Sequence, residues 1–174
     1  MVNKNITINL SDYRFCPARS CIFLLLGICL FSFNGCSSEK KITEPEVLDV
    51  LNKIEVAAKN KDADAIVANM SEKVQIKATI TASGQTQTFT FNREQYRDFI
   101  KKSFAAGSNY TYSRQNTQVK ISPDGKMAIV TDEVTESMTV SGQVIRSAGT
   151  EVATLGRENG KLVIQYLEAN GKQD

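Results

Sequence analysis

The chain has 174 residues, 41% of them hydrophobic, and its 21 basic and 19 acidic residues give a formal net charge of +2. It contains no histidine, and its four cysteines all lie at or before Cys36. The rest of the chain therefore lacks the thiol and imidazole ligands that most zinc, haem and iron–sulfur sites use. It also lacks a cysteine nucleophile and a histidine base. We expect neither a metal nor another cofactor.

An apolar segment near the N-terminus indicates where the protein resides. Residues 21–33 are almost entirely apolar, but they fall short of the about 20 residues that a membrane-spanning helix needs. Lys4, Arg14 and Arg19 precede them and small or polar residues follow, an order typical of a secretory signal peptide. After residue 35 basic and acidic residues are equal in number, so the net charge indicates no nucleic-acid partner.

This segment ends in the letters FNGC at residues 33–36. It resembles the signal of a bacterial lipoprotein, in which the final cysteine carries the lipid. The resemblance implies a signal peptide at residues 1–35, membrane attachment through a lipid on Cys36, and a polar tether at residues 36–42.

The residue after this cysteine bears on the choice of membrane. Ser37 resembles the pattern that sorts lipoproteins to the outer membrane. It implies a location in the bacterial cell envelope, on the outer membrane facing the periplasm if the host is Gram-negative. Two alternatives stay open on the sequence alone. The segment could be a conventional signal peptide cut after Ser38, or an anchor that is not cleaved.

Two helices are predicted at the start of the domain. Residues 43–60 carry apolar side chains at helical spacing, and Thr43 with Glu46 can form a capping box. Asp62 can cap a second, shorter helix. The side chains expected on the buried side of this second helix are Ile66, Val67 and Met70.

The pattern then changes from helical spacing to alternation. Residues 74–80 alternate apolar and polar side chains, which predicts a strand, and residues 86–91 return as a second strand. Asn92 can cap a third helix, which Gly107 ends. Four further strands joined by short turns, an antiparallel meander, are expected at residues 110–122, 126–140, 143–155 and 161–169.

The order of these elements resembles that of the nuclear transport factor 2-like superfamily, which includes ketosteroid isomerases, scytalone dehydratases and polyketide cyclases. Residues 57–80, "AAKNKDADAIVANMSEKVQIKATI", and the closing hairpin at residues 157–169, "RENGKLVIQYLEA", carry the resemblance. It implies an α+β, cone-shaped domain over residues 43–170, with residues 171–174 as a tail. In that fold three N-terminal helices pack on a curved, mainly antiparallel sheet around a pocket.

Candidate pocket residues follow from the alternation along residues 126–140. Asp132 and Glu136 share one face of this expected strand with apolar side chains. A carboxyl group in an apolar pocket has a raised pKa, which suits a general acid or base, and a tyrosine can donate a hydrogen bond to a developing oxyanion. The candidate catalytic residues are Asp132, Glu136, Tyr96 and Tyr110. The other residues expected to line the pocket are Tyr112, Val130, Val134, Met138 and Tyr166.

A second interpretation of the same residues is structural. One β-bulge would exchange the two faces of the strand, and Arg114 or Arg146 could pair with Asp132 or Glu136 across strands. We therefore expect a non-catalytic envelope protein that binds a small apolar ligand or a protein partner. The alternative is an isomerase, dehydratase or cyclase that uses a pocket carboxylate with a tyrosine. A homodimer formed through the sheet is a third hypothesis.

Overall fold

The computed structural model describes residues 40–173, so the predicted signal peptide, Cys36 and the first part of the tether lie outside the described residues. Within this range the chain forms three helices and six strands. In chain order they are α1 (Glu44–Lys59), α2 (Ala63–Val67), β1 (Met70–Ala82), β2 (Gln85–Phe91), α3 (Arg93–Ala106), β3 (Ser108–Ile121), β4 (Met127–Val140), β5 (Gln143–Glu158) and β6 (Lys161–Gln173). None of these described helices is long and apolar enough to cross a membrane.

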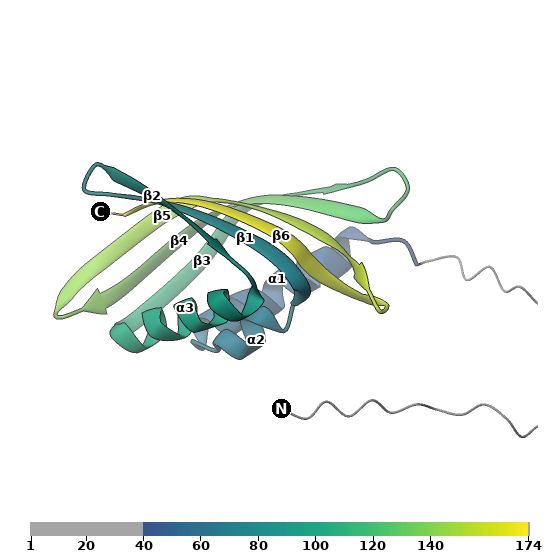
Figure 1. Ribbon diagram of the computed structural model, residues 1–174. Helices are drawn as coiled ribbons and strands as arrows, with labels where there is room; N and C mark the ends of the chain where they lie inside the picture. Colours follow the sequence, from purple (N-terminus) through teal and green to yellow (C-terminus); the bar gives the residue numbers. More distant parts are fainter. Residues whose placement is uncertain (1–39, 174) are drawn as a thin grey trace, which may run out of the picture. The chain divides into compact units, whose positions relative to one another are not determined.

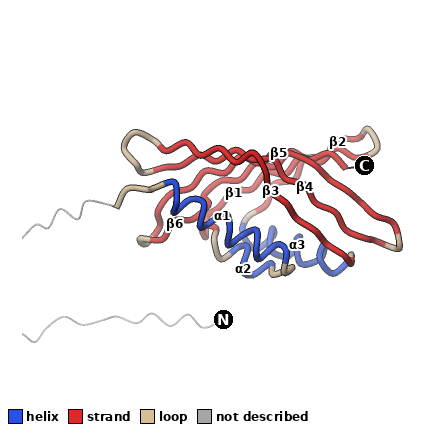
Figure 2. The backbone as a smooth tube through the Cα atoms, turned by 180° about the vertical axis from the view of Figure 1, so that it is seen from behind, coloured by secondary structure: helices blue, strands red, loops and turns tan. Residues whose placement is uncertain are grey.

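The strands form one curved sheet, and the helices lie on one face of it (Figures 1 and 2). The strand order is β2-β1-β6-β5-β4-β3. Neighbouring strands are antiparallel except β1 and β6, which are parallel. The predicted meander is confirmed as β3 to β6, and all three helices precede it in the chain. The α+β class and the mainly antiparallel sheet are therefore confirmed.

The first helix begins where the sequence predicts. The Glu46 carboxylate accepts hydrogen bonds from the Thr43 N–H (3.2 Å) and hydroxyl (3.1 Å), and the apolar stripe of α1 packs against β3 and β6. The prediction for Met70 is wrong. Helix α2 ends at Val67, and Met70 is the first residue of β1, because the backbone there already pairs with β6.

Burial along β4 decides which face of this strand is inside. Side chains at even positions from 128 to 134 are buried and those at odd positions are exposed. The register between β4 and β5 runs without a shift from end to end, so no bulge exchanges the faces of β4. The register of β3 with β4 shifts at two places instead, between Ser108 and Thr111 and between Gln115 and Gln118. Asn116, with a φ of 54°, forms the bulge at the second place. Asp132 therefore lies opposite this bulge, on the inner face.

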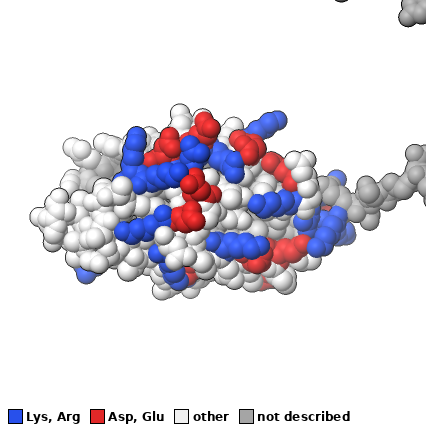
Figure 3. Space-filling model, turned by 90° about the horizontal axis from the view of Figure 1, so that it is seen from below, with Lys and Arg blue, Asp and Glu red and all other residues white. Residues whose placement is uncertain are grey.

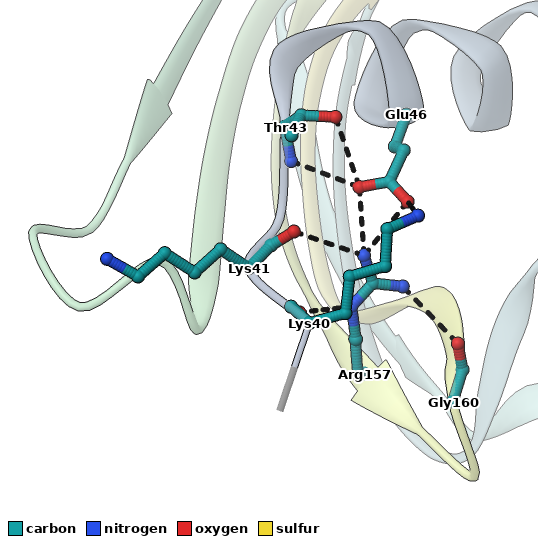
Figure 4. Close-up of polar contacts among 6 residues, drawn as sticks. All are labelled: Lys40, Lys41, Thr43, Glu46, Arg157 and Gly160. Carbon is teal, nitrogen blue, oxygen red and sulfur yellow. Dashed lines mark hydrogen bonds and ion pairs between the residues drawn. The ribbon is translucent and has the colours of Figure 1, made fainter. Parts of the chain in front are cut away.

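Residues 40–42, which the sequence assigns to the tether, are attached to the domain by Arg157 (Figure 4). The Arg157 side chain is 9% exposed; its Nε donates to the Lys40 carbonyl (2.8 Å) and its Nη2 to both carboxylate oxygens of Glu46 (2.9 and 2.8 Å). Ile42 is buried, and its N–H donates to the Gly125 carbonyl at 2.8 Å. At the other end, β6 runs past residue 170 to Gln173.

Charges of both signs are mixed on the helical side of the domain (Figure 3). They include the pairs Lys53–Asp49 and Lys59–Glu55, each one helical turn apart on α1. Such exposed pairs contribute well under about 1 kcal/mol each, so the core holds the helices in place. The fully buried side chains of that core include Val47 of α1, Ile76 of β1 and Leu155 of β5.

Candidate functional site

A cavity of about 440 Å³ lies between the helices and the inner face of the sheet. Most of its walls are apolar. Apolar side chains from all three helices line it, namely Leu51, Ile54, Ala58, Ile66, Phe99, Ile100, Phe104 and Ala106. The strands complete it, and Gly149 and Gly171, which pair across β5 and β6, let their backbones form part of the wall. The volume is typical of a site that holds a small molecule.

Arg114 and Asp132 form a buried ion pair in this cavity wall. The Arg114 Nε lies 2.6 Å from the Asp132 Oδ2, and the two side chains are 6% and 3% exposed. Arg114 is held in place by donating to the Leu51 carbonyl (3.0 Å) and the Tyr112 hydroxyl (2.8 Å). The other oxygen, Asp132 Oδ1, is buried and has no hydrogen-bond partner among the described residues. Burial raises the pKa of Asp132, and the Arg114 charge opposes that rise.

A third charged residue, Glu151, completes this cluster. It pairs directly with Asp132 across β4 and β5, and its Oε2 lies 3.9 Å from the Arg114 Nη2. Burial, and then the nearby Asp132 charge, raise the pKa of Glu151 to about 7. The side chain is 23% exposed. The Glu151 carboxyl group can therefore gain or lose a proton near neutral pH.

A second cluster of polar side chains surrounds Glu136. The Tyr110 hydroxyl donates to Glu136 Oε1 at 2.5 Å, and the Ser147 hydroxyl lies 3.5 Å from Oε2. Burial and the Glu136 charge raise the pKa of Tyr110, so its hydroxyl stays protonated. Tyr96 lines the same cavity from α3, and burial together with the charges of Glu151 and Glu136 raises its pKa. Its hydroxyl is thus a neutral hydrogen-bond donor beside two carboxyl groups.

The structure brings most of the predicted site residues together. Those that line the cavity are Asp132, Glu136, Tyr96, Tyr110, Tyr112, Val134 and Met138. Val130 and Tyr166 do not line it: Val130 is buried in the core, and the Tyr166 hydroxyl donates to Glu168. Both structural expectations for Asp132 hold at once, since it faces the pocket and is paired with Arg114.

Glu151 is the site residue that the sequence reasoning missed. The predicted turn at residues 141–142 could have revealed it, because Asp132 and Glu151 are equally far from this turn along a hairpin whose register does not shift. Among residues 40–173, no three acidic side chains come close enough to bind a metal ion.

No protein-family model and no curated protein matches the sequence. Solved structures do resemble it. A conserved protein from Planctomyces limnophilus aligns with a TM-score of 0.61 and 15% identity, over 75% of this chain and 97% of that chain. A proposed scytalone dehydratase from Novosphingobium aromaticivorans aligns with a TM-score of 0.58 and 11% identity, over 72% and 80%.

A hexachlorocyclohexane dehydrochlorinase (LinA) of type 2 also aligns, with a TM-score of 0.55 and 12% identity, over 72% of this chain and 82% of that chain. The domain has a nuclear transport factor 2-like fold. At these identities the likeness extends to the fold alone, because one fold carries many unrelated activities.

Proposed function

We propose that this domain binds a small, mainly apolar molecule in the cavity between its helices and its sheet. The observation that carries the proposal is the cavity itself, about 440 Å³ and lined mostly by apolar side chains. A filled core would be the more stable arrangement, because an empty apolar cavity destabilises a fold in proportion to its volume. The few polar groups in the walls would orient the ligand.

Native mass spectrometry tests this proposal. The protein would be produced with its full chain as the Cys36→Ser variant, which cannot be lipidated, and sprayed from a volatile buffer. A bound mass that leaves on collisional activation is the expected result, and its identity gives the ligand. A spectrum of the bare chain, unchanged after incubation with a small-molecule extract of the producing cells, would count against a ligand. A dimer in that spectrum would favour an interaction module.

We also propose that a lipid on Cys36 attaches the protein to the bacterial cell envelope. The support is the sequence order of basic residues, apolar segment and FNGC box. If the proposal is right, the domain begins only a few residues after the lipid, because Arg157 holds Lys40. Labelling cells with radioactive palmitate should mark the wild-type protein and leave Cys36→Ser unmarked. Equal labelling of both would exclude Cys36 as the site.

Acid–base catalysis is the second candidate function. Glu151, whose pKa is raised to about 7, shares the cavity with the protonated hydroxyls of Tyr96 and Tyr110. A carboxyl group poised near neutral pH can move a proton, and a neutral tyrosine can stabilise a developing oxyanion. This would make Glu151, rather than Asp132, the proton-transferring residue of an isomerase, dehydratase or cyclase. Turnover of the identified ligand, lost in Glu151→Gln, is the test.

A further inference from the structure

The charged side chains that line the cavity are mostly acidic. Among the described residues in its walls, Arg114 is the one basic side chain, whereas three carboxyl groups face the same space. The guanidinium is already engaged, since its three nitrogens face the Leu51 carbonyl, the Tyr112 hydroxyl and Asp132. An anionic ligand would have to compete with Asp132 for the same guanidinium.

Two of the carboxyl groups retain free acceptor oxygens. Asp132 is 3% exposed, and its Oδ1 has no hydrogen-bond partner within residues 40–173. A buried polar atom without a partner is destabilising, so an unsatisfied oxygen in a cavity wall points to a donor that arrives with the ligand. Glu151 is the directly paired residue on β5, and no described side chain donates a hydrogen bond to it. The two residues therefore lie side by side on neighbouring strands of the cavity wall.

The third carboxyl group is different. Each oxygen of Glu136 already accepts one hydrogen bond, from the Tyr110 hydroxyl or from the Ser147 hydroxyl. Its charge adds to those of the neighbouring pair. A cation that enters the cavity is therefore attracted by the same groups that would repel an anion.

We infer that the ligand of this cavity carries a cationic amine on a compact apolar body, with the ammonium group between Asp132 and Glu151. This inference rests on the proposed ligand-binding function and names the class of ligand. An ammonium group has three donors and no acceptor, which matches the free oxygens. The apolar body fills the space between α1, α3 and the sheet. A carboxylate or phosphate would bring a second negative charge beside Asp132 and find no free cation.

The experiment compares three molecules that share one rigid apolar body: 1-aminoadamantane, 1-adamantanol and 1-adamantanecarboxylate. Each is titrated calorimetrically into the full-length Cys36→Ser protein at neutral pH. The amine should bind at least about tenfold more tightly than the alcohol, and the carboxylate at least about tenfold more weakly. Binding of the alcohol with no preference for the amine overturns the charge inference but leaves the cavity proposal standing. Binding by none of the three overturns both.

Variants locate the ammonium site. Asp132→Asn and Glu151→Gln should each lower the affinity for the amine at least about fivefold more than they lower the affinity for the alcohol. Two variants are used because Asp132→Asn also removes the partner of Arg114, and thermal melting identifies any variant that does not fold. Glu133→Gln is the matched control, since Glu133 is exposed on the opposite face of β4. It should leave all three affinities unchanged. An amine preference that survives in both test variants overturns the inference.

Discussion

Asp132, which lines the cavity, offers one carboxylate oxygen to Arg114 and leaves the other without a hydrogen-bond partner among the described residues. The Arg114 Nε lies 2.6 Å from Asp132 Oδ2, while Oδ1 is buried without a partner among the described residues. The pair thus belongs both to the core and to the candidate site. Because each group compensates the burial of the other, we expect single replacements to be much worse than a double one.

Replacing Arg114 with Leu leaves the Asp132 carboxylate buried without its counter-ion. The free energy of unfolding should fall by about 3–5 kcal/mol, measured by urea denaturation. In the double variant Arg114→Leu/Asp132→Leu most of this loss should be regained, because the apolar pair needs no counter-ion. Lys53→Leu, which breaks the exposed pair with Asp49, should change the stability by about 0.5 kcal/mol or less. A double variant as unstable as the single one would show that the ion pair does not determine the loss.

Glu151 should make the fold less stable as the pH rises. Its pKa increases from an ordinary 4.5 to about 7 on folding, so the folded state holds the proton more tightly. The contribution of Glu151 to stability is therefore complete below pH 4.5 and declines until the pH passes about 7. Glu151→Gln removes this contribution, and at about pH 8 it should be more stable than the wild type by up to about 3 kcal/mol.

The measurement is urea unfolding at several pH values between about 4.5 and 8. The pKa of Asp132 is also raised, so the stability of the Glu151→Gln variant should still decline with rising pH, but by less than that of the wild type. The control Glu133→Gln should follow the wild-type curve. Parallel curves for Glu151→Gln and the wild type would show that Glu151 does not titrate in this window.

Two glycines that pair across β5 and β6 should respond differently to the same substitution. A Cβ added at Gly149 would overlap the backbone carbonyl of Asn170, whereas one added at Gly171 meets nothing within 4 Å. Gly149→Ala should lower the unfolding free energy by about 1–3 kcal/mol, because backbone must move. Gly171→Ala should stay within about 0.5 kcal/mol of the wild type. Equal effects in thermal melts would contradict this close approach of the strands.

Arg157 should control how firmly residues 40–42 are held. Arg157→Met removes donors from the Lys40 carbonyl and from Glu46, whose pKa is lowered to about 2 by Lys40 and Arg157. We expect the free energy of unfolding to fall by about 1–3 kcal/mol and hydrogen exchange at the Ile42 amide to become faster. Lys40→Met should have little effect, because the Lys40 side chain is 74% exposed. An Ile42 amide that stays fully protected in Arg157→Met would refute this role.

Local sequence patterns predicted most of the helices and strands. They also predicted that Asp132 and Glu136 share one face of β4. The alternation along β4 put Asp132 and Glu136 on one face with apolar side chains, but a bulge could have turned that face outward, and only the unshifted register with β5 shows that it is inside. The end of α2 was missed because pairing of Met70 with β6, a partner far along the chain, decides it. Local helical spacing carries no information about that partner.

The position of Arg114 could not be predicted with the same certainty. The bulge at Asn116 reverses which positions of β3 face inward, and nothing in the neighbouring letters requires it. The attachment of Lys40 by Arg157 joins residues that are 117 positions apart in the sequence, which no local pattern reveals. The position of Glu151, by contrast, follows from extending the hairpin register from its turn, so it could have been predicted from the sequence.

A ligand that occupies the cavity between the helices and the sheet would contact the isoleucines in its walls. The most direct measurement is a methyl NMR titration of the full-length Cys36→Ser protein, labelled at its isoleucines, with 1-adamantanol. We expect the signals of Ile54, Ile100 and Ile145, which line the cavity, to shift and saturate together. The signal of Ile129, which is exposed on the outer face of the sheet, should not shift. Shifts at Ile129 with no change at the cavity isoleucines would contradict binding in the cavity.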